Sequence, residues 1–406
     1  MKVGEARLNV SLSGTNLERA GDYNQRVVLQ AIRLNADVTR SELVELTGLT
    51  VPTIANITRR LVAADLARIA GRLQRGRGQP AVRLAINPNG AFGIGINIDR
   101  DHLTLVVLDL GGDVRARVSR DLPYALPDDV RTFVAEAMES ILASSDIAFD
   151  RVIGVGVAVP EPFGKALFHD QPSAYAAWDD VDITALLQDL LAWPIHVDND
   201  AAAAALGELE FGSRRDCSNF FYILLGAGLG GGLVVDGSYY RGGSARSGEI
   251  GFIISRHAAA EGEPIEARVS LSALYHRLSE AGCASGSLDA LTLANTRARA
   301  VIDAWIEEAA ALLVDPLIAL NCLVNPDAIL VGGRMPAELL DPLVATLNAN
   351  LAPYAPRLPS LAPVRRATMA ADAPAVGAAL LPFSKRLLPS DAILMNTGQV
   401  AASNDD

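Results

Sequence analysis

The chain of 406 residues is half hydrophobic, which is enough to bury the cores of two or three domains. No apolar run reaches the roughly 18 residues that a membrane span needs, and the first residues, MKVGEARLNVSLSG, lack the apolar core of a secretory signal. The three cysteines, Cys217, Cys283 and Cys322, lie far apart and form no CxxC pair, which excludes a disulfide framework and a recognisable zinc motif. We therefore expect a soluble cytoplasmic protein.

The net charge of −12 is unevenly distributed along the chain. Residues 17–83 contain 11 arginines, no lysine and six acidic residues, a net charge of +5, which leaves −17 for the remainder. A basic module attached to an acidic body is typical of a DNA-binding domain with an effector domain, because phosphate neutralisation supplies most of the nonspecific attraction to DNA. On charge alone, a solvated surface rich in arginine is an equal alternative.

The first predicted elements are three helices. One covers Tyr23–Asn35, whose apolar residues recur at helical spacing. A short helix begins at Thr39 or Arg40 and ends before Gly48, which can take the positive backbone angle of a sharp turn. Thr50 is a good N-cap, so a third helix begins there.

The third predicted helix carries polar side chains on a face away from its apolar residues, available to base edges and phosphates. After it, Leu66–Ala70 and Ala81–Ile86 can pair as two strands around a basic tip, which predicts a wing. A three-helix domain that contacts another protein is the alternative. We favour a winged helix-turn-helix, with DNA contacts from Arg40, Thr50, Thr53, Asn56, Arg60, Arg72, Arg75 and Arg77.

From Ala91 onward the pattern changes to strands and then to alternating strands and helices. Strands are expected at residues 92–98, 102–110, 113–122, 152–159, 195–197, 220–225, 232–235 and 328–331. Helices are expected at residues 127–148, 183–191, 199–209, 301–322 and 336–351. This order predicts two α/β lobes with a ligand cleft between them.

Five motifs in a fixed order carry a resemblance that no single motif would justify. They are IGVGVAVP, VDNDAAAAALGE, LLGAGLGGGLVVDG, GEIGF and NPDAILVGG, and they follow the helix-turn-helix layout. The chain resembles the ROK family of sugar kinases and sugar-responsive repressors from about Asn24 to Phe383. The resemblance implies an actin-like ATPase fold for the body.

The resemblance also implies a set of sugar-binding residues. Asp200 matches the base that takes a proton from the sugar hydroxyl in the kinases, although an Asp at a helix start is also an ordinary N-cap. Asn199, Glu249 and Glu266 match further sugar contacts. Several hydrogen-bond acceptors in one cleft suit a ligand with many hydroxyl groups. Residues 226–232 can hold a phosphate through backbone amides or form a tight hairpin, and the sequence leaves both open.

Two departures from the family pattern bear on catalysis and on metal binding. Active kinases carry Asp-x-Gly-Gly-Thr on the first strand, whereas this chain has Asn97-Ile-Asp-Arg-Asp101, which places two carboxylates where phosphate would approach. Family members with a structural zinc use the His of GEIGH and nearby cysteines, but this chain has Phe252 in place of that His, and His257 alone is too few ligands. We expect no ATP use, no zinc and no other cofactor.

The sequence thus predicts a non-enzymatic, sugar-responsive transcription regulator, more specifically a repressor, that binds operator DNA as a homodimer or a dimer of dimers. The predicted domains are residues 17–86 (winged helix-turn-helix), residues 87–198 completed by 372–390 (first lobe) and residues 199–371 (second lobe). The runner-up hypothesis is an ATP-dependent sugar kinase with an appended DNA-binding domain. A ligand-binding protein whose N-terminal module contacts another protein is the third.

Overall fold

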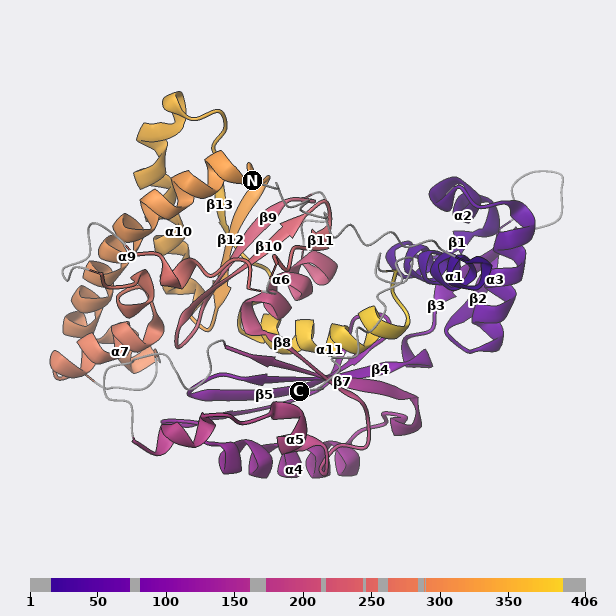
Figure 1. Ribbon diagram of the computed structural model, residues 1–406, viewed down its shortest axis with the longest axis horizontal. Coiled ribbons are helices and arrows are strands. Elements are labelled where there is room, and N and C mark those ends of the chain that lie inside the picture. Colours follow the sequence, from indigo (N-terminus) through magenta and orange to yellow (C-terminus); the bar gives the residue numbers. More distant parts are fainter. Residues whose placement is uncertain are drawn as a thin grey trace, which may run out of the picture. The chain divides into compact units, whose positions relative to one another are not determined.

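The computed structural model describes residues 16–73, 81–160, 173–212, 217–243, 246–254, 262–283, 288 and 290–389 (Figure 1). The chain divides into two compact units. Unit 1 comprises the residues up to Ala91 together with those from Phe383 onward, and unit 2 comprises Phe92–Pro382. Within the described ranges, no helix is long and apolar enough to cross a membrane.

In its described N-terminal part, residues 16–73 and 81–91, unit 1 contains three helices and a small antiparallel sheet whose strand order is β1-β3-β2. The helices are α1 (Leu17–Leu34), α2 (Arg40–Thr47) and α3 (Val51–Ala63), and the strands are β1 (Val38–Thr39), β2 (Ala67–Leu73) and β3 (Ala81–Ile86). Their apolar faces form one core that includes Val28, Ile32, Leu43, Ile54, Leu61 and Leu84. The apolar spacing of the sequence correctly identified the buried face of α3, whereas Leu34 and Leu46, which belong to the apolar spacing of the first two helices, are exposed.

The helix ends of unit 1 follow from specific capping residues. Thr39 caps α2 in a reciprocal capping box with Glu42, and Gly48 ends this helix with φ 68°. Thr50 caps α3 by accepting a hydrogen bond from the Thr53 amide, as its sequence position predicted. The first helix begins at Leu17, earlier than the predicted Tyr23, because Asn16 caps it by accepting from the Arg19 amide at 2.8 Å.

The strand pair that follows α3 contains an irregularity. The register of β2 against β3 shifts between Ile69 and Gly71, where Gly71 has φ 146°. The strand β2 therefore contains a bulge. It extends to Leu73, beyond the predicted end at Ala70. The tip of the predicted wing, residues 74–80, lies outside the described residues.

The first lobe of unit 2 is a five-stranded sheet in the order β6-β5-β4-β7-β8. Its strands are β4 (Phe92–Ile98), β5 (His102–Asp109), β6 (Val114–Asp121), β7 (Val152–Val159) and β8 (Ile195–Asn199). Helices α4 (Pro127–Ser144) and α5 (Ile183–Leu187) cover one face, where they share a core with the strands (Figure 1). The other face of β4 and β7 packs against α11 (Ala373–Arg386), which leaves no room for a Cβ at Gly95 or Gly156.

The second lobe is also five-stranded, in the order β11-β10-β9-β12-β13. Its strands are β9 (Phe220–Leu225), β10 (Leu229–Val235), β11 (Ser238–Tyr239), β12 (Ala328–Gly333) and β13 (Val364–Arg366). One face holds the larger core, with α7 (Leu271–Glu280), α9 (Thr296–Leu323) and α10 (Ala337–Leu351). The short helix α8 (Ala290–Ala294) precedes α9, and α6 (Asp200–Phe211) packs on the opposite face of the sheet.

Two helices lie between the sheets of unit 2, and small residues let them approach closely (Figure 1). A Cβ on Gly377 of α11 would lie 1.6 Å from the Ala203 carbonyl oxygen of α6, so only glycine fits there. Ala158, Ala203 and Ala378 form a small buried cluster at the same place. This explains the alanine-rich composition of α6, which begins at Asp200.

Candidate functional site

The glycine-rich turn between β9 and β10 is a tight hairpin whose glycines make room for carboxylates. The Gly226 amide donates to the Gly228 carbonyl at 3.0 Å, as expected from the hairpin alternative. A Cβ added to Gly226 would lie 3.2 Å from Asp99 Oδ2, and one added to Gly228 would lie 2.6 Å from Glu266 Oε2. A Cβ added to Gly230 would lie 3.9 Å from Asp200 Oδ1. The surface predicted to hold a phosphate is thus lined by three acidic side chains of the chain itself.

Asp200 is the first residue of α6, and Asn199 is its cap. The Asn199 Oδ1 accepts from the Ala202 amide at 3.0 Å, and Asp200 Oδ1 accepts from the Ala201 amide at 2.7 Å. The N-cap alternative for Asp200 is therefore wrong by one residue, because Asn199 has the extended backbone of a cap. The Asn199 amide oxygen, predicted as a sugar contact, is already used by the helix start.

The pKa of Asp200 is raised to about 7. Burial is the largest cause, followed by the negative charges of Asp99, Glu249 and Glu266, while the Ala201 amide opposes them. This coupling shows that three of the four predicted sugar-binding residues, Asp200, Glu249 and Glu266, lie in one electrostatic neighbourhood. Asp99, which sequence reasoning treated only as an obstacle to phosphate, belongs to the same group.

Glu266 is held by the hairpin. Its Oε2 accepts from the Leu229 amide at 2.9 Å, and burial raises its pKa although that amide and Arg100 oppose the shift. Glu249 immediately precedes the short 3-10 turn Ile250–Phe252. Glu249 and Glu266 both come from segments that pack against β10, so these two residues lie near the same strand although they are separated in the sequence.

The turn between β4 and β5 carries a buried ionic cluster that the sequence did not predict. Asp99 and Arg100 are 7% and 6% exposed. The Arg334 guanidinium, which follows β12 in the second lobe, lies 3.3 Å from Asp99 Oδ2 and also pairs with Asp101 Oδ1. Burial and Asp99 raise the pKa of Asp101 to about 6, against the opposing charges of Arg334, His102 and Arg100.

Two further buried polar groups lie on the first lobe near this turn. Arg100 is hydrogen-bonded to the Tyr175 hydroxyl, whose pKa burial raises to about 12. Asn97, which replaces the kinase aspartate, is 4% exposed, and its side-chain oxygen has no hydrogen-bond partner among the described residues. A buried acceptor without a donor is costly, so this atom favours a ligand or water that donates.

A second ion pair joins the two lobes and was also missed by sequence reasoning. Arg241, which follows β11, reaches Asp198 at the end of β8, with Nη1 3.2 Å from Oδ1. The same guanidinium lies 5.8 Å from the centre of the Tyr239 ring. Arg334 and Arg241 therefore each connect the second lobe to aspartates of the first.

Unit 1 presents most of the predicted DNA-binding side chains on its surface. Asn56 and Arg60 of α3 are exposed, and Thr50 and Thr53 share a hydrogen bond of 2.9 Å between their hydroxyls at the start of the helix. Arg59, which the sequence analysis did not select, is exposed and donates to Asn56 Oδ1 at 3.3 Å. This surface of α3 is polar and positively charged.

The remaining predicted DNA contacts differ in their surroundings. Arg40 at the start of α2 is exposed, but its Nε donates to Thr58 Oγ1 at 3.1 Å, which ties α2 to α3. Arg72 is exposed on β2. Arg75 and Arg77 lie outside the described residues.

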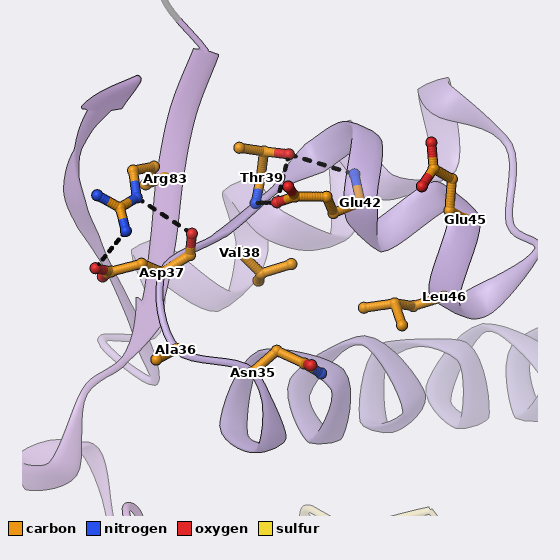
Figure 2. A pocket seen from close by; sticks show the side chains of 9 residues that line it. All are labelled: Asn35, Ala36, Asp37, Val38, Thr39, Glu42, Glu45, Leu46 and Arg83. Atoms are coloured by element: carbon orange, nitrogen blue, oxygen red, sulfur yellow. Dashed lines mark hydrogen bonds and ion pairs between the residues drawn. The ribbon is translucent and has the colours of Figure 1, made fainter. Parts of the chain in front are cut away.

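A pocket of about 670 Å³ lies at another corner of unit 1, between the end of α1 and the start of α2 (Figure 2). The Arg83 guanidinium lies 2.7 Å from the Asp37 carboxylate, and the Thr39 amide donates to Glu42 (Figure 2). Glu45 also lines the pocket, so three of its side chains are acidic. This corner is unsuited to DNA phosphates, which distinguishes it from the arginine-bearing surface of α3.

Metal binding has no visible basis in the described part of the chain. No group of three His, Cys, Asp or Glu side chains there is arranged to hold a metal ion. Phe252, in the place of the family's zinc-binding His, is half exposed, and His257 lies outside the described residues. The donor set that remains visible does not fit a structural zinc.

A family model described as "ROK family" matches residues 93–384. The chain belongs to the ROK family. Among curated ROK relatives, the xylose repressor of Bacillus subtilis (strain 168) is 27% identical over 231 residues, which are 56% of this chain and 59% of the repressor. The resemblance inferred from the five motifs is thereby confirmed.

Solved ROK structures support the fold. A ROK family transcriptional regulator described as a homologue of the Escherichia coli MLC protein matches with a TM-score of 0.65 and 23% identity, covering 93% of this chain and 97% of that one. A ROK family glucokinase from Streptomyces griseus, in complex with glucose and AMPPNP, matches with a TM-score of 0.56 and 23% identity, covering 72% and 99%. Unit 2 thus has the two-lobed, actin-like ATPase fold of sugar kinases, as the sequence predicted.

Proposed function

We propose that this ROK protein is a sugar-responsive transcriptional repressor of the cytoplasm. Unit 1 acts as a winged helix-turn-helix that binds operator DNA as part of a homodimer or a dimer of dimers. The cleft of unit 2 binds a sugar but transfers no phosphoryl group, so the protein is not an enzyme. Similarity to a repressor and to a transcriptional regulator that aligns with nearly the whole chain supports this assignment.

The observation that carries the proposal is the ionic cluster at the β4–β5 turn. In a kinase, this turn and the glycine-rich hairpin receive the phosphates of ATP, whereas here Asp99 lies against the hairpin and Arg334 is engaged by Asp99 and Asp101. At a separation of 4 Å and an effective dielectric constant of about 20, each pair of like charges costs about 4 kcal/mol. A triphosphate therefore meets repulsion where a kinase provides attraction.

The DNA-binding half rests on the surface of α3. Asn56, Arg59 and Arg60 are exposed together on a helix whose opposite face is buried in the core of unit 1. An exposed Asn and two Arg on one helix are the side chains that read base edges in the major groove and neutralise phosphates. Two-fold dimers of such modules read half-sites about 34 Å apart.

Operator binding tests this half directly. After selection of a binding site from random duplexes, Asn56→Ala is expected to reduce affinity mainly at one base position, by about 10-fold to 100-fold. Arg60→Ala is expected to weaken binding to all sequences and to lower the salt slope by about one. Arg357→Ala, which removes one exposed arginine from unit 2, is the control. Unchanged operator affinity in both α3 variants would contradict the proposal.

An ATP-dependent sugar kinase is the alternative, favoured by the fold shared with a glucokinase and by Asp200 at the position of the kinase base. A coupled assay with ATP, magnesium and a set of hexoses separates the two. We expect no turnover above that of Asp200→Asn. Turnover abolished by this substitution would establish the kinase instead.

A further inference from the structure

The start of α3 is the apolar end of an otherwise polar helix surface. Val51, the first residue of the helix, is 67% exposed, and Pro52 beside it is exposed as well. Neither side chain is part of the apolar core that the described residues of unit 1 form, and both residue types are weak helix formers. Core packing therefore does not account for this pair of residues, which we call the apolar tip of α3.

The apolar tip is poorly equipped to bind a phosphate group. A helix start ordinarily leaves its first backbone amides free, and such amides bind anions. Here Pro52 has no N–H, and the Thr53 amide donates to the Thr50 hydroxyl oxygen at 3.4 Å. The hydroxyls of Thr50 and Thr53 also form a hydrogen bond of 2.9 Å with each other. Both the side chains and the backbone of this helix start therefore favour an apolar contact over an anionic one.

The apolar tip continues the surface of α3 that bears the proposed DNA contacts. Pro52 and Asn56 are one turn apart, so their side chains share a face of the helix, about 6 Å apart along its axis. The Cα–Cβ bonds of a helix tilt toward its N-terminus, which directs the Val51 side chain toward the helix start. Recognition helices of the helix-turn-helix class contact base edges with their N-terminal residues. Continuity with Asn56 therefore directs the tip toward base edges.

We propose that the apolar tip of α3 reads a thymine in the operator by contact with its C5-methyl group. This inference rests on the proposed function, because it concerns how unit 1 recognises operator DNA. The thymine methyl is the apolar group among the base-edge groups of the major groove, so it is the group that complements valine and proline side chains there. Asn56 matches an adenine, and 6 Å corresponds to about two base-pair steps of about 3.4 Å. The thymine is expected about two base pairs from that adenine.

Removal of single methyl groups from the operator tests the proposal on the full-length protein. In an operator selected from random duplexes, each thymine is replaced in turn by deoxyuridine, which lacks only the C5-methyl group, and binding is measured by fluorescence anisotropy. At one thymine of each half-site, the replacement is expected to weaken binding about fourfold, because one buried methyl group is lost. If no replacement weakens binding by more than about 1.5-fold, the proposal is wrong.

A variant of the tip assigns the methyl contact to these two side chains. The double variant Val51→Ser and Pro52→Ser removes both apolar groups, and serine is accepted in a helix at least as well as valine or proline. It is expected to bind the thymine and deoxyuridine operators equally well. Val114→Ser, which changes a valine of β6 that is 42% exposed, is the control and is expected to keep the fourfold preference for thymine. An undiminished preference in the double variant would show that the methyl group acts through DNA shape, and it would overturn the proposal.

Failure of the inference and failure of the proposed function give different results. If no operator can be selected, both the DNA-binding function and the reading of thymine are wrong. If an operator is selected and bound without regard to its thymine methyl groups, the DNA-binding function stands and only the role of the apolar tip is wrong.

Discussion

Replacing Asp200 by asparagine should stabilise the protein, and the gain should grow with pH. The folded protein holds Asp200 with a pKa of about 7, compared with 3.8 for an unperturbed aspartate. Between these two values the folded chain keeps a proton that the unfolded chain has released, so the stability contributed by this group is lost as the pH rises. The asparagine side chain of the variant does not titrate, and it retains an oxygen that can accept from the Ala201 amide.

The size of the effect follows from the shift. Each pKa unit corresponds to about 1.4 kcal/mol, so the full shift corresponds to about 4 kcal/mol. Because Asp200 keeps some contact with solvent, we expect about half of this, near 2 kcal/mol. The variant and the natural protein should be about equally stable at pH 4 and should differ by about 2 kcal/mol at pH 8.

Urea unfolding of both proteins from pH 4 to pH 8 measures this difference, since titrating groups remote from Asp200 act equally on both. Asp128→Asn is the control, because Asp128 is exposed in the first turn of another helix, α4, and its loss should cost up to about 1 kcal/mol. A difference for Asp200→Asn that does not change with pH, or a variant less stable than the natural protein at pH 8, would refute the electrostatic account of the cleft.

Substitutions at three other residues test the packing of unit 2, and the effect of each is measured by the urea midpoint at constant slope. Arg334→Leu removes the ion-pair partner of Asp99 and Asp101 and should lower the free energy of unfolding by about 3 kcal/mol at pH 8. The loss should be smaller at pH 5, because Asp101, with its pKa of about 6, is then protonated. A loss of stability that does not depend on pH would contradict this expectation. The buried Glu208 carboxylate accepts hydrogen bonds from the Thr368 and Met369 amides. Glu208→Ala should therefore lower the free energy of unfolding by about 3 kcal/mol, and Glu208→Gln, which keeps one acceptor oxygen, by about 1 kcal/mol. Equal losses for the two variants would show that these hydrogen bonds do not contribute to stability. Tyr222→Phe should stabilise by up to about 1 kcal/mol, because the Tyr222 hydroxyl is buried without a partner among the described residues, and a loss of more than 1 kcal/mol would indicate an unseen partner.

Most of the fold could be predicted because its signals are local. Helices such as α3 and α9 bury continuous apolar faces, and strands such as β4, β5 and β7 are bounded by turn residues. The errors occurred where side-chain patterns are weak. The strand β10 begins at Leu229, three residues before the predicted start, because Gly230–Gly232 has no side chains from which alternation can be read.

The candidate site was only partly predictable. The acidic residues were found through the ordered motifs of the ROK resemblance, and Asp200, Glu249 and Glu266 do come together. Arg334 was not found, because its partner Asp101 lies 233 residues earlier and no spacing rule connects them. The one available signal was a basic residue directly after Gly332-Gly333, at the end of a strand that belongs to one of the five motifs.

Under the proposed function, the carboxylates grouped around Asp200 also offer a way for a ligand to act as a signal. A ligand shifts a conformational equilibrium only to the extent that it binds one state more tightly than the other. Arg334 and Arg241 of the second lobe form ion pairs with aspartates of the first lobe. In this arrangement the pKa values of Asp200 and Glu266 are raised, which means that the ionised forms of both side chains are disfavoured. A sugar that donates hydrogen bonds relieves this repulsion only while the lobes keep the carboxylates together. Under the proposed function we therefore expect sugar binding to favour the paired arrangement over any in which the lobes separate.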